Sequence, residues 1–360
     1  MLSSFALTTL SLLPISVDLS ADWQVNTQIS SLSYAENNSV YDFVKGNESD
    51  YQPGQNAFTY DEFSISAQYQ GFALSLFYRY EWFLDYSEDA MELYGTTVNG
   101  TLIDPNRTYD LSLKTSHINT EGIRLAYMHQ FEKVNVYVAG AYLKAKELMD
   151  GEANGHAELT GSCGDGLECY TGELDLSYTY SEDELFDRQV DAPKSLYGYT
   201  FDFGLDWVMS DSWYASLYIQ DVFSEILWDE SPYTDANATT STSKVVDGKV
   251  KIEPTITGYE GSEDFKQRLP TKYQMALSYR FDPQHLAYLK GFHAYGATLL
   301  HVGYQYHYSG SIWGIKLYPE QEALGLEFQH RYMKFLIASK PFDYQESEVL
   351  ELSLGFQFPF

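Results

Sequence analysis

The side chains with the clearest chemical potential are charges that interrupt alternating apolar segments. Between residues 72 and 82 every second residue is large and apolar, while Arg79 and Glu81 fall on the opposite face. A β-strand has a period of two, so both charges share one face with smaller neighbours. Charges placed in this way line a polar passage and set its selectivity, or they pair and fill a closed space. The other candidates are Arg124, Asp202, Asp206, Lys272, Arg280, His301, Lys316, Glu327, Lys334, Lys340 and Glu351.

Catalytic chemistry has little support in the residues. Among eight histidines, His301 and His307 share one face of a segment, with Gln305 between them. A nucleophilic serine–histidine pair would also need a facing serine, whose strand register the sequence does not reveal. No calcium-loop motif occurs, and no histidine or second cysteine pair lies at zinc spacing. We therefore expect no enzyme, no metal and no cofactor.

Two cysteines, Cys163 and Cys169, enclose the sequence Gly-Asp-Gly-Leu-Glu. In an oxidising compartment this spacing favours a small disulfide at a loop tip, and Gly164 and Gly166 supply the backbone freedom for so tight a ring. A metal site is the alternative. The surrounding segment 147–195 holds 13 acidic residues. It is typical of a solvated loop, and divalent-cation binding is the second interpretation.

These side chains are carried by short segments in which apolar and polar residues alternate. Tight connections occur near residues 70, 132 and 211, whereas long polar connections cover 35–60, 83–117, 147–195 and 229–270. Two classes of connection are typical of a barrel with short turns at one end and long loops at the other. The thirteen recognisable segments are 23–34, 61–69, 72–82, 121–131, 134–144, 196–207, 213–228, 272–281, 298–308, 311–318, 323–329, 332–340 and 350–360.

The last segment carries the most specific signal. From Leu350 to Phe360 every second residue is leucine or phenylalanine, with Glu351 and Ser353 among the residues between. This tail resembles the final strand of Gram-negative outer-membrane β-barrel proteins. The resemblance implies that Phe358 and Phe360 act as a signal read by the barrel-assembly machinery. It also implies a location in the bacterial outer membrane, with lipid and lipopolysaccharide as the surroundings.

These observations predict an all-β fold, one antiparallel transmembrane β-barrel of about 14 strands, with 12 as the alternative. Aromatic residues reach 16% of the chain, which fits aromatic girdles at two membrane interfaces. Because single-chain bacterial barrels have even strand numbers, a further strand is expected near 249–257, although Asp247-Gly248 is itself a hairpin signal. A soluble sandwich or propeller is the competing architecture.

The chain divides into residues 1–21, which are expected to be a signal peptide, and residues 22–360, which form one barrel with long acidic outer loops. A first strand retained in the mature protein is the alternative for the beginning of the chain. The formal net charge of -29 excludes nucleic-acid binding, which needs a basic surface. The sequence does not indicate an oligomeric state.

Three functions follow from this fold. The first is a channel or transporter for a small solute, with apolar solutes among the candidates because Phe77, Tyr214, Tyr218 and Leu336 fall on the inward face. The second is a non-conducting surface barrel whose acidic loops bind a partner. The third is a barrel enzyme. A lumen with a continuous path favours the first function, whereas a lumen filled by paired arginine and glutamate favours the second.

Overall fold

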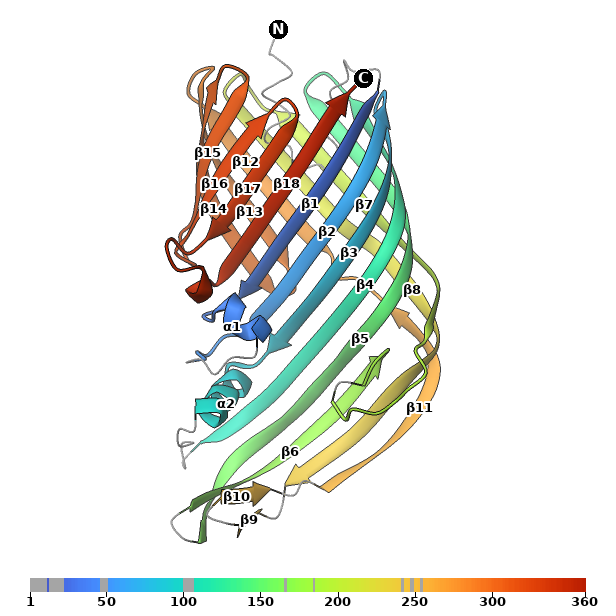
Figure 1. Ribbon diagram of the computed structural model, residues 1–360, viewed down its shortest axis with the longest axis vertical. Helices are drawn as coiled ribbons and strands as arrows, with labels where there is room; N and C mark the ends of the chain where they lie inside the picture. The colour runs from blue at the N-terminus through green and yellow to red at the C-terminus, as the bar shows by residue number, and fades with distance from the viewer. Residues whose placement is uncertain are drawn as a thin grey trace.

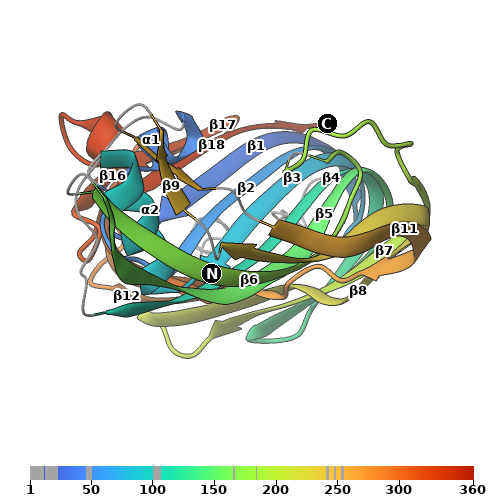
Figure 2. The same cartoon turned by 90° about the horizontal axis from the view of Figure 1, so that it is seen from below.

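The computed structural model describes residue 12 and residues 23–45, 51–99, 107–164, 167–183, 185–240, 243–246, 249–252 and 255–360. Most of these residues are in β-strands, which confirms the all-β prediction. The strands are strongly tilted, and the outline of the molecule is oval when it is seen from below (Figures 1 and 2).

Fourteen antiparallel strands close into a barrel, and every strand pairs with its sequence neighbours in the circuit. The circuit consists of β1 (Gln24–Ala35), β2 (Asn56–Tyr69), β3 (Phe72–Tyr86), β4 (Thr108–Gln130), β5 (Val134–Gly164), β7 (Lys194–Val208), β8 (Trp213–Thr240), β12 (Lys272–Arg280), β13 (His285–Ala294), β14 (Ala297–Tyr308), β15 (Ser311–Tyr318), β16 (Ala323–His330), β17 (Met333–Ser339) and β18 (Val349–Pro359).

The closing seam joins the first strand to the last. β1 and β18 pair from Tyr34 with Val349 to Gln24 with Pro359. On β18 the alternation of outward and inward side chains agrees with the prediction, because Leu352 and Phe356 are exposed on the outer face while Glu351 lines the interior. Pro359 lies at the end of the strand, where the missing backbone donor costs little.

The fourteenth barrel strand does not lie where we expected it from the rule of even strand numbers. The expected strand near 249–257 is not part of the barrel, and the missing member is instead β13. The outward positions of β13 include Ala287 and Gly291, while Leu286 and Phe292 point inward. Apart from Leu289, the large apolar side chains of β13 lie on the inward face, so the periodicity that identified the other strands is largely inverted here.

The connections confirm the division into two ends. Tight turns at 70–71, 209–212 and 309–310 lie at one end, together with the start of β1 and the C-terminus (Figure 1). Gly71 and Gly310 occupy these turns with φ of 87° and 79°, a conformation that other residues adopt only with strain. The long connections lie at the opposite end.

Several strands continue beyond the barrel at this opposite end. β5 is 31 residues long and β8 is 28 residues long. Within the barrel β7 lies between β5 and β8, and beyond the end of β7 its place is taken by β6 (Leu167–Tyr180), which pairs with both β5 and β8. On the other edge of β8, β11 (Thr255–Gln267) continues the sheet beyond the end of β12 (Figure 1). A separate hairpin of β9 (Ser243–Val246) and β10 (Lys249–Ile252) lies nearby.

The extension corrects the interpretation of 147–195 as a solvated loop and of 229–270 as a polar connection between barrel strands. β6 does alternate, because one face carries Leu174, Leu176 and Tyr178 while the other carries Glu173, Asp175 and Ser177. The many acidic residues of the surrounding segment gave it the composition of a loop, so this alternation was not recognised. The hairpin signal at Asp247-Gly248 is confirmed by β9 and β10. It does not disturb strand parity because the hairpin stands outside the circuit.

Two short helices cover the same end. α1 (Val40–Lys45) follows Ser39, whose Oγ accepts a hydrogen bond from the Asp42 backbone N–H at 3.1 Å. α2 (Glu88–Asn99) follows Ser87, which caps Ala90 in the same way at 3.1 Å. Serine is a favoured residue at this position because it satisfies a free backbone donor. Among the described residues, no helix combines the length and apolarity needed to span a bilayer.

Two expectations concern residues outside this description. Apart from residue 12, the proposed signal segment 1–21 lies outside the described residues. The side chains of Cys163 and Cys169 also lie outside them, although the backbone of both cysteines belongs to the hairpin of β5 and β6. The signal peptide and the disulfide therefore stay predictions.

The disulfide can be tested by thiol labelling. A ring of so few residues should stabilise the hairpin tip by about 2 kcal/mol through loop-closure entropy, and the barrel itself should be unaffected. We expect no maleimide incorporation into unreduced, denatured protein, and unchanged heat-modifiable gel migration after reduction. Two reactive thiols in the unreduced protein would exclude the bond and return attention to a metal site.

The orientation of β18 can be tested by introducing a charge on either face. Leu354→Arg should lower the free energy of unfolding in lipid vesicles by about 2–4 kcal/mol, because the side chain would meet hydrocarbon near the midplane. Ser353→Arg is the matched control and should cost far less, because Ser353 borders an internal cavity. Urea titration measures both. Tolerance at position 354 combined with a loss at position 353 would mean that the register is inverted.

Candidate functional site

A connected group of buried charges crosses the interior of the barrel. We call it the lumen bridge, and its members are Glu62, Arg79, Glu81, Arg124, Asp202, Asp221 and Lys272. They come from strands on facing walls, since β2, β3 and β4 supply four members while β7, β8 and β12 supply three. Three cations therefore meet four carboxylates, and the bridge is close to electrical balance.

Arg79 is the centre of the bridge. Its side chain is fully buried, and its Nη1 donates to both carboxylate oxygens of Asp221 at 3.1 Å. On the other side, its Nε and Nη2 donate to Glu62 at 3.1 and 3.0 Å. β4, β5 and β7 separate β3 from β8 in the sheet, so the bonds between Arg79 and Asp221 join two walls across the lumen.

Lys272 on β12 binds two of the carboxylates that also contact Arg79. Its ammonium nitrogen lies 2.6 Å from Asp221 and 2.9 Å from Glu81, and the side chains of all three are almost completely buried. Tyr295, in the turn between β13 and β14, donates a hydrogen bond to Glu81 at 2.6 Å. Each carboxylate at the centre of the bridge therefore meets two or more donors, as burial of a charge requires.

Arg124 extends the bridge toward β7. It donates two hydrogen bonds of 3.0 Å to the carboxylate of Glu62, and its Nε lies 3.6 Å from Asp202. The guanidinium carbon lies 4.5 Å from the ring centroid of Phe77, so the guanidinium packs against the face of the ring. This two-pronged contact with Glu62 is the geometry that favours arginine over lysine.

Asp221 reaches the interior because β8 carries a bulge. Opposite the two steps from Phe201 to Phe203, β8 advances from Phe223 to Ile219, so it contains extra residues at this point. Asp221 has φ of 57°, and both Gln220 and Asp221 are buried. A regular strand would direct one of these neighbours outward, so the bulge turns Asp221 toward Arg79.

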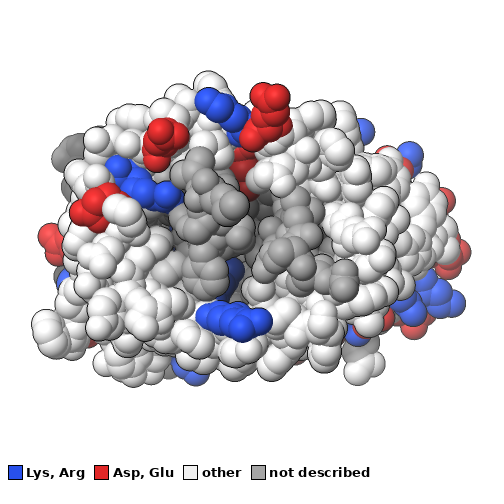
Figure 3. All heavy atoms as spheres, turned by 90° about the horizontal axis from the view of Figure 1, so that it is seen from above, with Lys and Arg blue, Asp and Glu red and all other residues white. Residues whose placement is uncertain are grey.

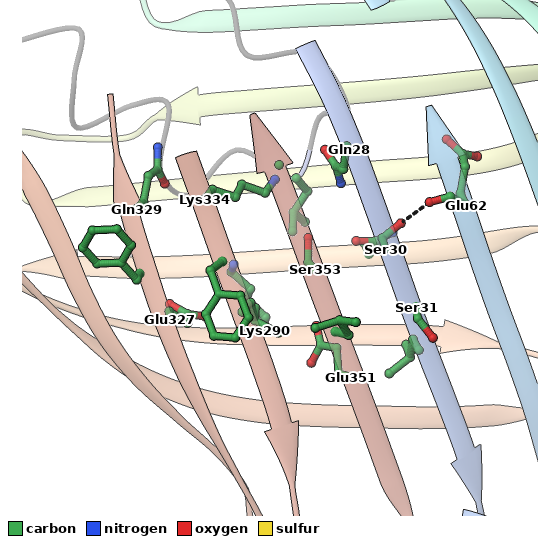
Figure 4. A pocket seen from close by; sticks show the side chains of 18 of the residues that line it. Gln28, Ser30, Ser31, Glu62, Lys290, Glu327, Gln329, Lys334, Glu351 and Ser353 are labelled. Atoms are coloured by element: carbon green, nitrogen blue, oxygen red, sulfur yellow. Dashed lines mark hydrogen bonds between the residues drawn. The ribbon is translucent and has the colours of Figure 1, made fainter. Parts of the chain in front are cut away.

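A cavity of about 360 Å³ lies beside the bridge. Glu62 and Arg124 form its border with the bridge, and β1 and the strands from β13 to β18 form most of the remaining wall, to which β8 and β12 also contribute. Figure 4 shows polar side chains from several of these strands directed into it. Leu12, whose backbone N–H donates to Ser216 Oγ at 3.3 Å, also borders this space.

Part of the cavity wall is itself paired. Lys316 bonds to Glu351, which also accepts a hydrogen bond of 2.6 Å from Tyr318. The Lys316 side chain crosses Gly325 on the neighbouring strand, where an added Cβ would come within 2.6 Å of the lysine Cγ. Glycine is therefore required at position 325 for Lys316 to lie flat against the wall and reach Glu351.

Glu327 is held by neutral donors. It accepts hydrogen bonds from Tyr288 at 2.5 Å and from Gln305 Nε2 at 2.9 Å. Lys290 and Lys334 line the same cavity and form no ion pair with any residue that the structure describes. The cavity therefore differs from the bridge in having cations whose charge is not matched by a contacting carboxylate.

The residues singled out from the sequence separate into three groups. Arg79, Glu81, Arg124, Asp202 and Lys272 meet in the bridge, whereas His301, Glu327 and Glu351 line the cavity. Asp206 is buried and accepts a hydrogen bond from Ser216 at 2.6 Å, and Arg280 is half-buried at the short-turn end of β12.

Three important residues were missed. The exposed Phe63 and Ile65 on β2 already place Glu62 on the inward face, so ordinary alternation would have found it. Asp221 depends on the bulge, which has no sequence signal. Lys290 lies on β13, the strand whose alternation is inverted.

The end that carries the short turns is hollowed at its centre, and charged side chains lie around the depression (Figure 3). At the described residues no group of three or more histidine, cysteine or acidic side chains is arranged to hold a metal ion. His301 contacts Tyr318, with ring centroids 4.8 Å apart.

Comparisons with known proteins give similarity in fold. No family model matches the chain, and no curated protein sequence is significantly similar. The CymD monoaromatic hydrocarbon channel aligns with 11% identity and a TM-score of 0.40, over 100% of this chain and 92% of that one. The toluene transporter TodX of Pseudomonas putida aligns with 8% identity and a TM-score of 0.40, over 98% and 95%. A TodX mutant reaches a TM-score of 0.46 at 8% identity, over 94% and 91%. We draw no argument about the solute from values this low.

The contribution of the lumen bridge to the free energy of unfolding can be measured with a matched pair of lysine substitutions. Lys272→Met leaves the carboxylates of Asp221 and Glu81 without one of their cations, and loss of one partner of a buried pair costs about 3–5 kcal/mol. Lys146→Met removes an exposed ion pair, Lys146 to Glu121 at 2.8 Å, and should not change stability measurably. Urea titration compares the two. Equal effects would show that the bridge does not stabilise the barrel.

Proposed function

We propose that the protein is a channel of the bacterial outer membrane that admits a small solute through the barrel. The observation that carries this proposal is the cavity of about 360 Å³ inside a closed barrel. Its volume is in the range of small-molecule sites, and its border combines charged, amide and apolar side chains. A barrel built only as a scaffold has no need of such a space.

The outer face supports the membrane location. Large apolar side chains are exposed on the outside of nearly every barrel strand, which in water would be unfavourable over so large an area. Exposed aromatic side chains such as Phe72, Phe131 and Trp213 lie at the ends of the strands, as in membrane barrels. Examples on successive strands are Leu74, Leu76, Ile123, Leu125, Val138, Tyr142, Phe201, Phe203, Met275, Leu277, Leu300, Val302, Ile315, Leu326, Ile337 and Leu352.

This location defines the partners we propose. Lipid would surround the belt, and lipopolysaccharide would meet the end that carries the long connections. The short turns would face the periplasm, as in other bacterial barrels. Phe358 and Phe360 are exposed at the end of the chain and would be available to the barrel-assembly machinery.

The lumen bridge makes the passage selective rather than wide. It joins facing walls at the level of Arg79 and Asp221, so a solute must pass beside paired charges. The same observation favours a second candidate function, a non-conducting barrel in which paired charges close the lumen. We do not propose an enzyme, because among the described residues that line the cavity no hydrogen bond joins a serine to a histidine.

Planar-bilayer conductance of the refolded protein separates these functions. The wild type should conduct weakly. Arg79→Ala/Asp221→Ala should conduct several-fold more, because this double variant removes the contact that joins the two walls. Arg107→Ala/Asp89→Ala is the matched control, since it removes an arginine–aspartate pair outside the lumen and should leave the current unchanged.

Two outcomes would contradict the channel. Absence of current in both the wild type and the bridge variant would identify a non-conducting barrel. An equal rise in current for the surface control would mean that the increase arises from loss of stability and not from opening of the lumen.

A further inference from the structure

Two lysines that line the cavity, Lys290 and Lys334, differ from Lys272 and Lys316 in the way their charge is met. Lys272 and Lys316 each bond to a carboxylate. Among the described residues, no carboxylate oxygen lies within 4.0 Å of the ammonium group of Lys290 or Lys334. An unpaired ammonium in a barrel interior is unfavourable unless water or a ligand meets it.

We propose that Lys290 and Lys334 form a binding site for the anionic group of a compact organic solute, such as a carboxylate on an aromatic ring. This site rests on the proposed channel function and names the class of solute that the cavity admits. The two lysines are on β13 and β17, which β14, β15 and β16 separate in the sheet, so they approach the cavity from different parts of its wall (Figure 4).

Lys334 is available to a ligand. It lies on the inward face of β17, and it is nevertheless exposed because it borders the cavity. Its strand partners are Gln329 on β16 and Gly355 on β18, and Gly355 in turn faces Gln28 on β1. Gly355 leaves the space over β18 open, so the lysine stem extends across it toward amide side chains that could also contact a carboxylate.

Lys290 lies among aromatic side chains and not against a carboxylate of the described residues. Its ammonium nitrogen lies 4.9 Å from the ring centroid of Tyr288, and it faces His301 across the strand pair. The carboxylate of Glu327 accepts hydrogen bonds from Tyr288 and Gln305 and lies more than 4.0 Å from the Lys290 ammonium group. The charge of Lys290 is consequently not neutralised by contact with its own wall.

The rest of the lining indicates the shape of the solute. Leu336 lies next to Lys334 on the inward face of β17, and Phe292 lies next to Lys290 on the inward face of β13. Leu32 on β1 adds a third apolar side chain. A small apolar body with one anionic end therefore matches both the lining and the volume of about 360 Å³.

The inference is tested with benzoate and its neutral counterpart benzamide, which has the same ring and nearly the same size. Equilibrium dialysis of each radiolabelled compound against the full chain in detergent, corrected for empty micelles, should show saturable binding of benzoate and much weaker binding of benzamide. Lys334→Gln and Lys290→Gln should each weaken benzoate binding about tenfold or more, since a hydrogen bond to a charged group is lost.

Three further variants keep the result interpretable. Lys334→Arg should retain binding because the charge is kept. Lys146→Gln changes a lysine outside the cavity and should bind as the wild type does. Lys334→Gln should unfold at the same or a higher temperature than the wild type, because it removes a cation without a partner. A marked loss of stability would show that Lys334 has a structural role and would overturn the assignment.

The outcomes also separate this site from the channel itself. Equal binding of benzoate and benzamide, or benzoate binding that both lysine variants retain, would refute the anion site. Bilayer current without benzoate binding would refute the anion site and leave the channel intact. Benzoate binding without current would refute the channel and leave the site.

Discussion

The interior of this barrel depends on one interaction, the contact of Arg79 with Asp221 across the lumen. The guanidinium joins two strands that lie on facing walls, and the bulge in β8 exists at the point where that contact is made. Lys272 and Glu62 complete the charge balance around it. Because buried charges are tolerated only when they are matched, this contact dictates which neighbouring strands can carry which charges.

The bridge also divides the barrel into two electrostatic regions. On its own side, cations and carboxylates satisfy one another, so the bridge offers little to a solute. On the other side, Lys290 and Lys334 face a cavity in which the remaining carboxylates already have partners. A constriction that is self-neutralised next to a cavity with unmatched cations is a sensible arrangement for a selective passage, since restriction and recognition are assigned to different residues.

The strands beyond the barrel illustrate how the surroundings control what a sequence reveals. Within the apolar belt, an apolar exterior and a polar lumen impose an alternation that can be read from the residues. In β6, β11 and the distal part of β5 the acidic composition concealed the strands, so segments that resemble acidic loops are in fact paired strands. β13 is a different case, because most of its large apolar side chains fill the interior and Leu289 alone among them lies outside.

The sequence by itself determined the all-β class, the strand number of about 14, the two kinds of connection and the inward position of residues such as Arg79, Glu81 and Arg124. These properties follow from a period of two acting within each strand, which is local information. Only the tertiary structure shows that Asp221 turns inward, that Lys272 shares its carboxylates with Arg79, and that Lys290 and Lys334 have no carboxylate within 4.0 Å among the described residues. Those facts depend on a bulge and on which walls face each other across the lumen, and no spacing along the chain encodes a distance between facing walls.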